Sequence, residues 1–322
     1  MEKAQKWRAL GFNPYGNGYE PKHLAQDIIA RHQAQSTEDL AKDSPVYDVA
    51  GRVVAIRSFG KAAFIKLRDR SGAIQVHVKK DALGEAFEAF KLADLGDFVA
   101  SEGPLFRSKK GELTLSATKF IPLTKALRPM PEKWHGLNDV EVRYRQRYLD
   151  LLSNPEVKEV FLKRTQLVHF LRELLDGRGF LEVETPTLHA LVSGAAARPF
   201  LTHHNALDMD RSMRIAPELY LKRLVVSGFG RVYEINRNFR NEGISTRHNP
   251  EFTMLEFYQA YATYEDLMNL IEEMISEAAV RVAGSTDLTY QDEKRRRSEK
   301  PSPPYWTRTS RTQSGCGPSC SK

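Results

Sequence analysis

The spacing of hydrophobic and polar residues changes twice along the chain, at about residues 45 and 128. Residues 1–44 carry one thin apolar stripe at helical spacing, which predicts a helical extension and is formed by Leu24, Ile28, Ile29 and Leu40. Residues 45–127 instead alternate apolar and polar positions in short runs: YDVAGRVVAIRS, AAFIKLRDRSG, AIQVHV, DFVASEGPLF and ELTLSATKFIPL. Turn residues separate several of these runs, as expected between antiparallel strands: Gly60-Lys61, Ser71-Gly72 and Lys110-Gly111.

The order of these runs predicts an OB-fold barrel over residues 45–127. A helical segment, DALGEAFEAFKLADLG, separates three strands from two more, and this is the element order of that fold. OB-folds commonly bind single-stranded nucleic acid through stacked aromatic rings and a basic rim. Phe64 and Gln75 would lie on adjacent strands, with Arg52, Arg57 and Lys61 close by. The alternative is that Phe64 belongs to the barrel core and the basic residues are only solvated.

Residues 128–290 mix helical and strand patterns. A basic helical stretch carries apolar residues at helical spacing from Leu167 to Leu175 and ends at Gly177 and Gly179. LEVETPTL reads as a strand broken by Pro186. GFGRVYEINRNFRNEG and NPEFTMLEFYQAYATY read as two strands joined by a loop near residues 241–250, and an amphipathic helix follows.

Composition narrows the class of protein. The 322 residues are 41% hydrophobic and 28% charged, enough for one or two ordinary cores. The sequence has no apolar run of membrane-spanning length and no signal-peptide pattern at its N-terminus, so we expect a cytoplasmic protein that does not enter a membrane. The two cysteines, Cys316 and Cys320, lie at the C-terminus, so the sequence suggests no disulfide framework or cysteine-based metal site.

Residues 291–322 differ from the rest of the sequence. They are rich in Arg, Ser, Thr and Pro, have no hydrophobic period and supply five of the seven net positive charges. The global charge is therefore weak evidence for a nucleic-acid partner, which must be argued from local patches. A disordered basic tail is one interpretation. Translation in a shifted reading frame is the other, and the abrupt change after DLTYQ favours it.

The densest group of charged residues lies between the last two predicted strands. Arg240 has a planar guanidinium suited to a phosphate. Glu242, two residues later, would lie on the same face of an extended strand and can accept a hydrogen bond from an exocyclic amine. Phe252 could supply a flat apolar surface for a ring, and Arg247 and His248 lie in the loop. Together they indicate a nucleotide site, although no GxxxxGK[ST] phosphate loop occurs. The alternative is a salt-bridged surface hairpin.

These residues resemble the motifs of the class II aminoacyl-tRNA synthetases. Phe239-Arg240-x-Glu242, followed by His248-x-x-x-Phe252, is similar to motif 2, and GFLEVETPTL, with Pro186 at the dimer interface, resembles motif 1. SGAAARPF, RIAPELYLKRL, RHNPEFTMLEFYQAY and the linker TKALRPMPEKWHGLND resemble the bacterial lysyl-tRNA synthetases within this class. The resemblance covers roughly residues 10–290.

The resemblance implies roles for the matching residues. ATP would be bound by Arg240, Glu242, Arg247, His248, Asn249 and Phe252, of which Arg240, Glu242 and His248 would be catalytic. The α-amino group of lysine would be held by Gly194 and Glu218, and its ε-ammonium by Glu256 and Tyr258. A buried ammonium needs such partners, and a carboxylate and a phenol two residues apart share one face of a strand. The uridine-rich lysine anticodon would be read by Arg57, Phe64, Gln75 and Glu112.

The same resemblance implies an α+β fold and a function in translation. We expect a helical extension (1–44), an OB-fold anticodon-binding barrel (45–127), a class II catalytic domain with an antiparallel sheet flanked by helices (128–290), and the tail (291–322). The implied reaction is ATP-dependent, magnesium-assisted activation of lysine and its transfer to lysine tRNA by a homodimer.

The sequence departs from the family pattern after residue 285. Nothing there resembles motif 3, and the family's magnesium ligands would also lie beyond the matching part, so no metal ligand is assigned in this sequence. We therefore expect the barrel to fold, while the catalytic half is poorly stable and inactive because its sheet edge and core are open. The alternative is a non-catalytic tRNA anticodon-binding fragment. A relative that transfers lysine to a protein is a third possibility, but such relatives usually lack the OB domain.

Overall fold

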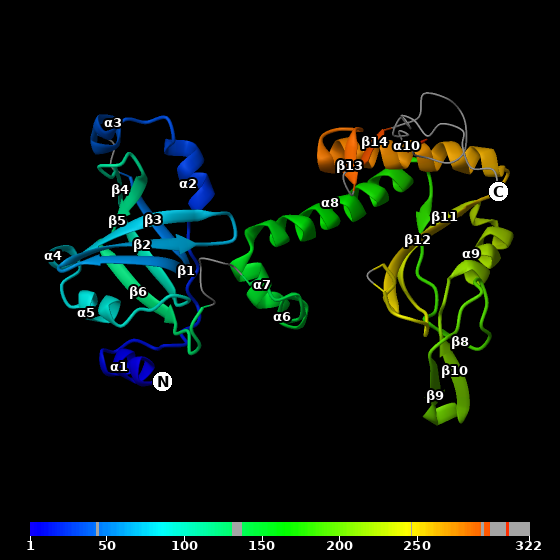
Figure 1. Cartoon of the computed structure of the whole chain (residues 1–322), viewed down its shortest axis with the longest axis horizontal. Helices are drawn as coiled ribbons and strands as arrows, with labels where there is room; N and C mark the ends of the chain where they lie inside the picture. Colours follow the sequence, from blue (N-terminus) through cyan, green and yellow to red (C-terminus); the bar gives the residue numbers. More distant parts are fainter. Residues whose placement is uncertain (43–44, 131–136, 246, 291–292, 297–306, 309–322) are drawn as a thin grey trace, which may run out of the picture. The chain divides into compact units, whose positions relative to one another are not determined.

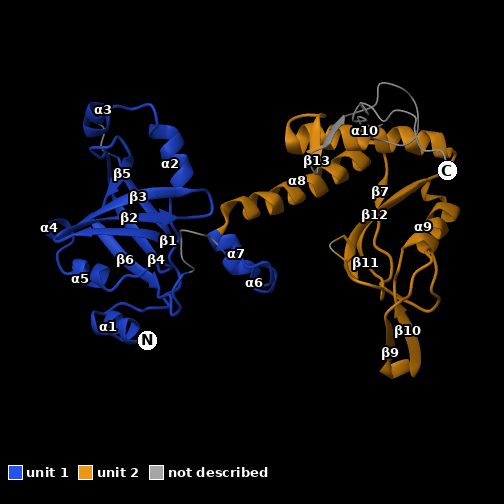
Figure 2. Ribbon diagram, in the orientation of Figure 1, with its two compact units in different colours: residues 1–153 blue, residues 154–322 orange. Residues whose placement is uncertain are grey.

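The structure is a computed structural model that describes residues 1–42, 45–130, 137–245, 247–290, 293–296 and 307–308. The chain divides into two compact units, Met1–Ser153 and Asn154–Lys322, which are coloured separately in Figure 2 and are considered one at a time below. None of the described helices is long and apolar enough to cross a membrane.

The first unit is built around a closed six-stranded barrel (Figure 1). The strands follow the order β1-β2-β3-β5-β4-β6, and β1 also pairs with β4, which closes the barrel. Their bounds are β1 Val46–Phe59, β2 Ala62–Arg68, β3 Ala73–Lys79, β4 Phe98–Arg107, β5 Leu113–Ser116 and β6 Lys119–Thr124. This arrangement is the predicted OB-fold, with one more strand than the sequence pattern indicated.

Alternation of side chains decides which face of each strand enters the barrel. Ala63, Ile65 and Leu67 of β2 are buried in the core, while Phe64 and Lys66 point outward. The alternative interpretation of Phe64 as a core residue is therefore wrong. At Gly103, an added Cβ would lie 1.8 Å from the carbonyl oxygen of Ser116, so β4 can pass this close to the end of β5 only with glycine.

Two predicted elements are each divided in the structure. The helix expected over residues 81–96 consists of α4 (Lys80–Leu83) and α5 (Ala86–Lys91), because Gly84 between them has a φ of 55°. The last predicted strand of the barrel, residues 112–123, consists of β5 and β6, between which residues 117 and 118 make no strand pairing.

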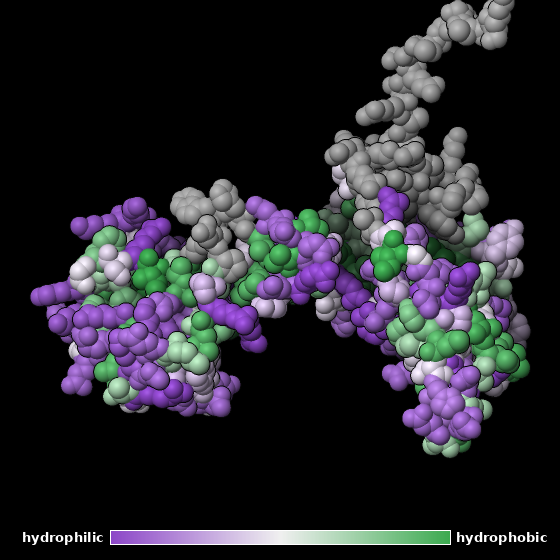
Figure 3. Space-filling model, turned by 60° about the horizontal axis from the view of Figure 1, so that its bottom comes forward, coloured by the Kyte–Doolittle hydropathy of each residue, from purple (hydrophilic) through white to green (hydrophobic). Residues whose placement is uncertain are grey.

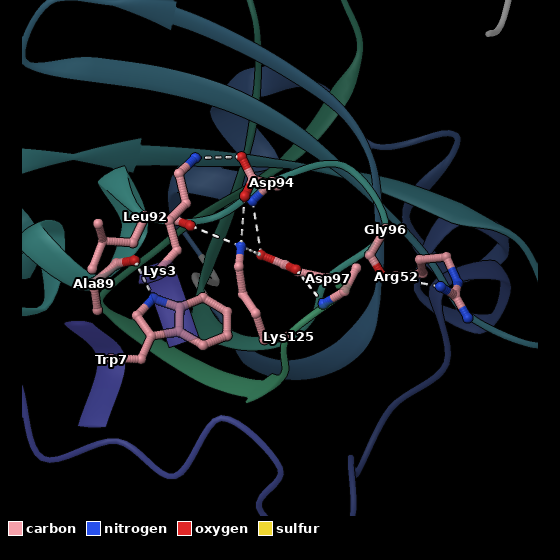
Figure 4. Close-up of polar contacts among 10 residues, drawn as sticks. Lys3, Trp7, Arg52, Ala89, Leu92, Asp94, Gly96, Asp97 and Lys125 are labelled. Atoms are coloured by element: carbon pink, nitrogen blue, oxygen red, sulfur yellow. Dashed lines mark hydrogen bonds and ion pairs between the residues drawn. The ribbon is translucent and has the colours of Figure 1, made fainter. Parts of the chain in front are cut away.

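Helices from the N-terminal extension cover the barrel. These are α1 (Glu2–Ala9), α2 (Ala25–His32) and α3 (Thr37–Lys42). The indole Nε1 of Trp7 on α1 donates a 2.9 Å hydrogen bond to the carbonyl of Ala89 (Figure 4). The ammonium of Lys125 lies 4.8 Å from the centroid of the same indole and 2.6 Å from Oδ2 of the fully buried Asp97. The first unit also contains α6 (Val140–Arg145) and α7 (Arg147–Ser153).

The second unit contains two small sheets and three α-helices in its described part up to residue 287. The helices are α8 (Pro155–Gly177), α9 (Glu218–Leu224) and α10 (Tyr264–Ala283), and α9 continues into a wider turn, η2 (Val225–Phe229). One sheet has the order β12-β11-β7, and the other the order β8-β10-β9. The strands are β7 Leu181–Glu182, β8 Leu188–His189, β9 Leu201–His204, β10 Met209–Met213, β11 Arg231–Phe239 and β12 Glu251–Gln259, with one 3-10 turn at Asn205–Leu207 (η1).

The core of this unit lies between β11 and the helices α8 and α10 (Figure 1). Phe170, Leu174 and Leu175 on α8 pack with Tyr233 of β11 and with side chains of α10. Pro186 falls between β7 and β8, so the predicted strand is interrupted where its sequence indicated. Because one face of β11 serves this core, its opposite face is left for polar side chains.

The C-terminal segment is described only in part. β13 (Leu288–Tyr290) pairs with β14 (Glu293–Arg296), which pairs with β15 (Thr307–Arg308). Most of the tail from residue 291, including Cys316 and Cys320, lies outside the described residues. The interpretation of the tail as disordered or frame-shifted concerns residues outside the described part of the chain, and it stays a prediction.

Candidate functional site

The candidate site lies along the antiparallel hairpin of β11 and β12. In its register, Glu234 pairs with Glu256 at one end, and Asn238 pairs with Phe252 at the other. Since side chains alternate along a strand, Glu234, Asn236 and Asn238 follow one another on the face of β11 opposite the helical core. Arg240 comes directly after the strand, where its backbone N–H donates a 2.8 Å hydrogen bond to the carbonyl of Pro250. This face therefore forms a polar row between two groups of predicted ligand-binding residues.

The end near the connecting loop forms a pocket of about 210 Å³. It is lined by all six residues that the sequence assigned to ATP, Arg240, Glu242, Arg247, His248, Asn249 and Phe252, together with Gly243 and Pro250. The guanidinium carbon of Arg240 lies 5.1 Å from the centroid of the Phe252 ring. Oε1 of Glu242 accepts a 3.2 Å hydrogen bond from the backbone N–H of Arg198. The pocket thus combines a guanidinium, a carboxylate and an aromatic face, which are complementary to a nucleotide.

The residues predicted to hold lysine lie at the other end. Gly194 has a φ of 90°, and a Cβ added there would lie 3.0 Å from the Cβ of Glu218. The hydroxyl of Tyr258 donates a 2.7 Å hydrogen bond to Oε1 of Glu256. The ammonium of Lys222 lies 2.5 Å from Oε1 of Glu218 and 5.9 Å from the centroid of the Tyr258 ring. A protein ammonium thus already lies among these groups.

Burial and neighbouring charges shift the pKa values of Glu256 and Tyr258 at this end of the site. Burial raises the pKa of Glu256, and the carboxylates of Glu218 and Glu234 raise it further, against the opposing effects of the Tyr258 hydrogen bond and Lys222. Burial also raises the pKa of the Tyr258 phenol, as does its bond to Glu256. A bound cation would relieve the repulsion among the three carboxylates, so the electrostatics favour an ammonium ligand.

Glu234, the first residue of this polar row, forms a buried ion pair with Arg214. The guanidinium of Arg214 is 2.8 Å from Oε1 of Glu234, and both side chains are less than one-tenth exposed. Arg214 also donates to the carbonyls of Arg237 and Thr185, and the Thr185 hydroxyl donates to Oε2 of Glu234. These bonds join the strand-like segment before Pro186 to β11. These bonds were not predicted from the sequence, since only the fold brings residues 185, 214 and 234 together.

A separate pocket of about 470 Å³ lies on the outer face of the barrel. All four residues predicted to read an anticodon, Arg57, Phe64, Gln75 and Glu112, line it. Six more residues line it that were not predicted from the sequence: Phe59, His77, Phe106, Ser108, Lys109 and Lys110.

The rings in this pocket form a continuous row. The Phe64 and His77 rings stack at 4.4 Å between centroids, and the Phe106 ring lies 5.6 Å from that of His77. Burial lowers the pKa of His77, as does the charge of Lys79. His77 follows Gln75 by two residues, and this period-two spacing could have found it. An uncharged ring between two phenyl rings suits stacking of bases.

The described residues show no candidate metal centre. No group of three or more His, Cys, Asp or Glu side chains is placed to hold an ion in the part of the chain that the structure describes. Pro186, predicted at a dimer interface, is exposed.

Comparison with known proteins matches each unit to a family. The family model described as tRNA synthetases class II (D, K and N) matches residues 139–313, and the model described as an OB-fold nucleic acid binding domain matches residues 47–123. The first matched range includes part of the tail.

Curated relatives agree with these matches. The chain is 60% identical over 294 residues to the lysine–tRNA ligase of Anaeromyxobacter sp. (strain K), which covers 90% of this chain and 57% of the relative. It is 53% identical over 292 residues to that of Carboxydothermus hydrogenoformans, with 90% and 58% covered, and 50% identical over 308 residues to that of Oceanobacillus iheyensis, with 95% and 62% covered. The chain thus spans about three-fifths of the length of these relatives. Because the family model covers more than half of the chain, the protein belongs to the D, K and N group of class II tRNA synthetases.

Proposed function

We propose that this chain is the anticodon-binding and substrate-binding part of a lysine–tRNA ligase that works in the cytoplasm. The observation that carries the proposal is the arrangement on the β11–β12 hairpin. Arg240 and Phe252 line a pocket of about 210 Å³ at one end, and Glu218, Glu256 and Tyr258 gather around an ammonium at the other. The names and identities of the relatives support lysine as the amino acid.

The proposed reaction has two steps. The lysine carboxylate attacks the α-phosphorus of ATP, forming lysyl-adenylate and releasing pyrophosphate. The terminal adenosine hydroxyl of lysine tRNA then attacks the lysyl carbonyl, and AMP leaves. In the first step, Arg240 would stabilise charge on the α-phosphate, Glu242 would orient the adenine amino group, and Phe252 would stack on the ring.

The remaining residues of the site would hold the outer phosphates and lysine. Arg247, His248 and Asn249 line the pocket where the outer phosphates would lie. Gly194 and Glu218 would bind the α-amino group, while Glu256 and Tyr258 would bind the ε-ammonium. Magnesium, which the family implies, would neutralise phosphate charge when bound. We assign no described residue to it, because these residues contain no candidate group of ligands.

Recognition of lysine tRNA is proposed for the barrel pocket. The aromatic row would stack on anticodon bases, and Gln75 and Glu112 would contact base edges. Arg57, Lys109 and Lys110 supply positive charge for the RNA backbone.

We also propose that the intact protein is a homodimer with Pro186 at its interface. Exposed hydrophobic side chains on the same unit support this proposal, and Leu191, Leu201 and Val226 are among them. Figure 3 shows hydrophobic surface in green on this unit. Sedimentation velocity measured over a range of concentrations tests it.

Lysine-dependent exchange of pyrophosphate into ATP tests the proposed activity, with Arg240→Ala as the blank. Exchange above that blank would show adenylate formation by this chain and would contradict the expected inactivity of its catalytic half. Absence of exchange with retained binding of a lysine anticodon stem-loop would favour the second candidate, a tRNA-binding protein without catalysis. The barrel pocket favours that candidate specifically, because all its predicted residues lie within the described part of one compact unit.

A further inference from the structure

Three buried polar atoms, two on β11 and one on the residue directly after it, have no hydrogen-bond partner among the described residues. They are Nδ2 of Asn236, Oδ1 of Asn238 and Nε of Arg240. Asn236 is 8% exposed and Asn238 is fully buried. Such atoms are costly to leave unsatisfied, and native proteins contain few of them. Two residues apart, Asn236 and Asn238 share the face of β11 that joins the two ends of the candidate site, and Arg240 follows directly after the strand.

The guanidinium of Arg240 is meanwhile engaged elsewhere. It lies over the Phe252 ring, 5.1 Å from its centroid, and both residues line the same pocket. The guanidinium therefore occupies the aromatic surface on which a nucleotide base would stack. A base and a guanidinium cannot both lie on the same face of the ring, so a base that stacks on this face displaces Arg240.

The unsatisfied atoms indicate where it moves. Nε of Arg240 is a donor without an acceptor, and Oδ1 of Asn238 is an acceptor without a donor. Residues on either side of a strand residue such as Phe239 are about 6.7 Å apart at Cα, which an arginine side chain can span. A bond between these two atoms would satisfy both, and would leave the terminal nitrogens of the guanidinium for a phosphate.

We propose that Asn238 is a positioning residue that receives Arg240 when adenine displaces it from Phe252. Arg240 thus has two alternative partners, the Phe252 ring without nucleotide and the Asn238 carbonyl with nucleotide. This inference rests on the proposed binding of ATP in this pocket. Asn238 is held for the role by Asn236, because Nδ2 of Asn238 donates a 2.6 Å hydrogen bond to Oδ1 of Asn236 and its own Oδ1 is thereby turned away.

The proposal predicts opposite effects on two ligands. Arg240→Met removes the competitor for Phe252 and the phosphate contact together. Adenosine, which has no phosphate, should bind this variant about twofold to tenfold more tightly than the wild type, the range expected for loss of a competing cation–π contact. ATP should bind it more weakly. Asn238→Leu should weaken both ligands, because Arg240 then stays on Phe252.

The experiment titrates adenosine and ATP separately into the full chain, with ligand-detected NMR to reach weak affinities. Asn238→Leu is measured alone and with Arg240→Met. If Asn238 acts through Arg240, the Leu substitution weakens adenosine binding about threefold or more in the wild-type background and has no effect once Arg240 is Met. Asn238→Asp keeps an acceptor oxygen and should bind adenosine at least as well as the wild type. Asn236→Leu should also weaken adenosine binding in the wild-type background, because it removes the acceptor that orients Asn238.

Several results would overturn the inference. One is adenosine binding to Arg240→Met no tighter than to the wild type. Another is an equal loss on Asn238→Leu in both backgrounds, which would show a purely structural role; failure of Asn238→Asp to retain affinity has the same meaning if that variant is folded by circular dichroism. Binding of neither ligand to the wild type or to Arg240→Met would overturn the proposed ATP site, and this inference with it.

Discussion

The hydroxyl of Tyr258 donates a 2.7 Å hydrogen bond to Glu256, two residues earlier on the same face of β12. Burial raises the pKa of Glu256, and the bond to Tyr258 opposes this shift without removing it. The Tyr258 hydrogen bond therefore orients the carboxyl group of Glu256, while burial makes its ionisation costly. Such a group gains most from a bound cation, which is the property expected of the partner of a lysine ammonium.

Glu256→Gln should reduce lysine affinity by about tenfold or more, since it removes a charged hydrogen-bond acceptor while preserving shape. Isothermal titration of lysine into both proteins at neutral pH measures the change. Glu251→Gln is the matched control, because Glu251 lies on the same strand but is exposed and paired with Arg237. Equal losses in the two variants would remove Glu256 from the proposed lysine site.

The same substitution should change the pH dependence of stability. A carboxyl group whose pKa is higher in the folded chain stabilises that chain at low pH, and this contribution is lost as pH rises through the folded pKa. The pKa of Glu256 is raised above its ordinary value of 4.5. Glu256→Gln should therefore be at least as stable as the wild type at neutral pH, and lose this advantage at about pH 4. Urea midpoints at the two pH values test this, and a less stable variant at neutral pH would contradict it.

Patterns with a fixed period predicted the fold well. The period-two alternation around Phe64 predicted a strand whose faces the structure reproduces. The extended strand expected through Arg240 and Glu242 is wrong, because β11 ends at Phe239 and both residues lie in the connecting loop. The break between α4 and α5 at Gly84 could not be predicted, because a glycine can be tolerated within a helix. Only its φ of 55° shows that α4 ends there.

Contacts between distant residues could not be predicted in the same way. The spacing of Arg240, Glu242 and Phe252 indicated a nucleotide site directly, but Gly194 and Glu112 were assigned by resemblance alone. No sequence pattern near Arg214 or Glu234 indicates their ion pair, because from the sequence alone each residue could equally be an exposed surface charge. Burial of both follows from the packing of three segments, which a one-dimensional pattern does not contain.

Arg214→Met should destabilise the second unit by about 3–5 kcal/mol, because it leaves Glu234 buried without its counter-charge. Arg237→Met provides the control, since its ion pair with Glu251 is 3.0 Å long but more than half exposed. That loss should be about 1 kcal/mol or less. Adding Glu234→Leu to Arg214→Met should recover part of the stability, because no lone charge then remains. Chemical denaturation followed by circular dichroism measures all three, and equal effects of the two arginine substitutions would refute the argument.

Lys125→Met should destabilise the first unit by a similar amount, about 3–5 kcal/mol, because it removes the counter-charge of the buried Asp97 carboxylate. The ammonium of Lys125 also lies 2.8 Å from Oδ2 of Asp94, so its removal loosens the attachment of α1 (Figure 4). The matched control is Lys119→Met, whose ion pair with Glu102 is exposed and worth about 1 kcal/mol or less. Limited proteolysis near Trp7 provides the second measurement. Unchanged unfolding and unchanged cleavage in Lys125→Met would show that this network does not hold the helix.

Phe64→Ala should weaken binding of a lysine anticodon stem-loop by about 1–3 kcal/mol, the value of one stacked base. Phe64 stacks on His77, so the substitution also ends the aromatic row at that ring. Fluorescence anisotropy with a labelled stem-loop measures the loss, and Tyr15→Ala, an exposed ring that does not line the pocket, is the control.

The salt dependence of stem-loop affinity distinguishes base stacking from phosphate contacts. Lys110→Ala should lower the slope of log affinity against log salt by about 0.7 if it contacts one phosphate, whereas Phe64→Ala should leave that slope unchanged. A changed slope in Phe64→Ala would mean that the ring positions the basic residues rather than stacking on a base.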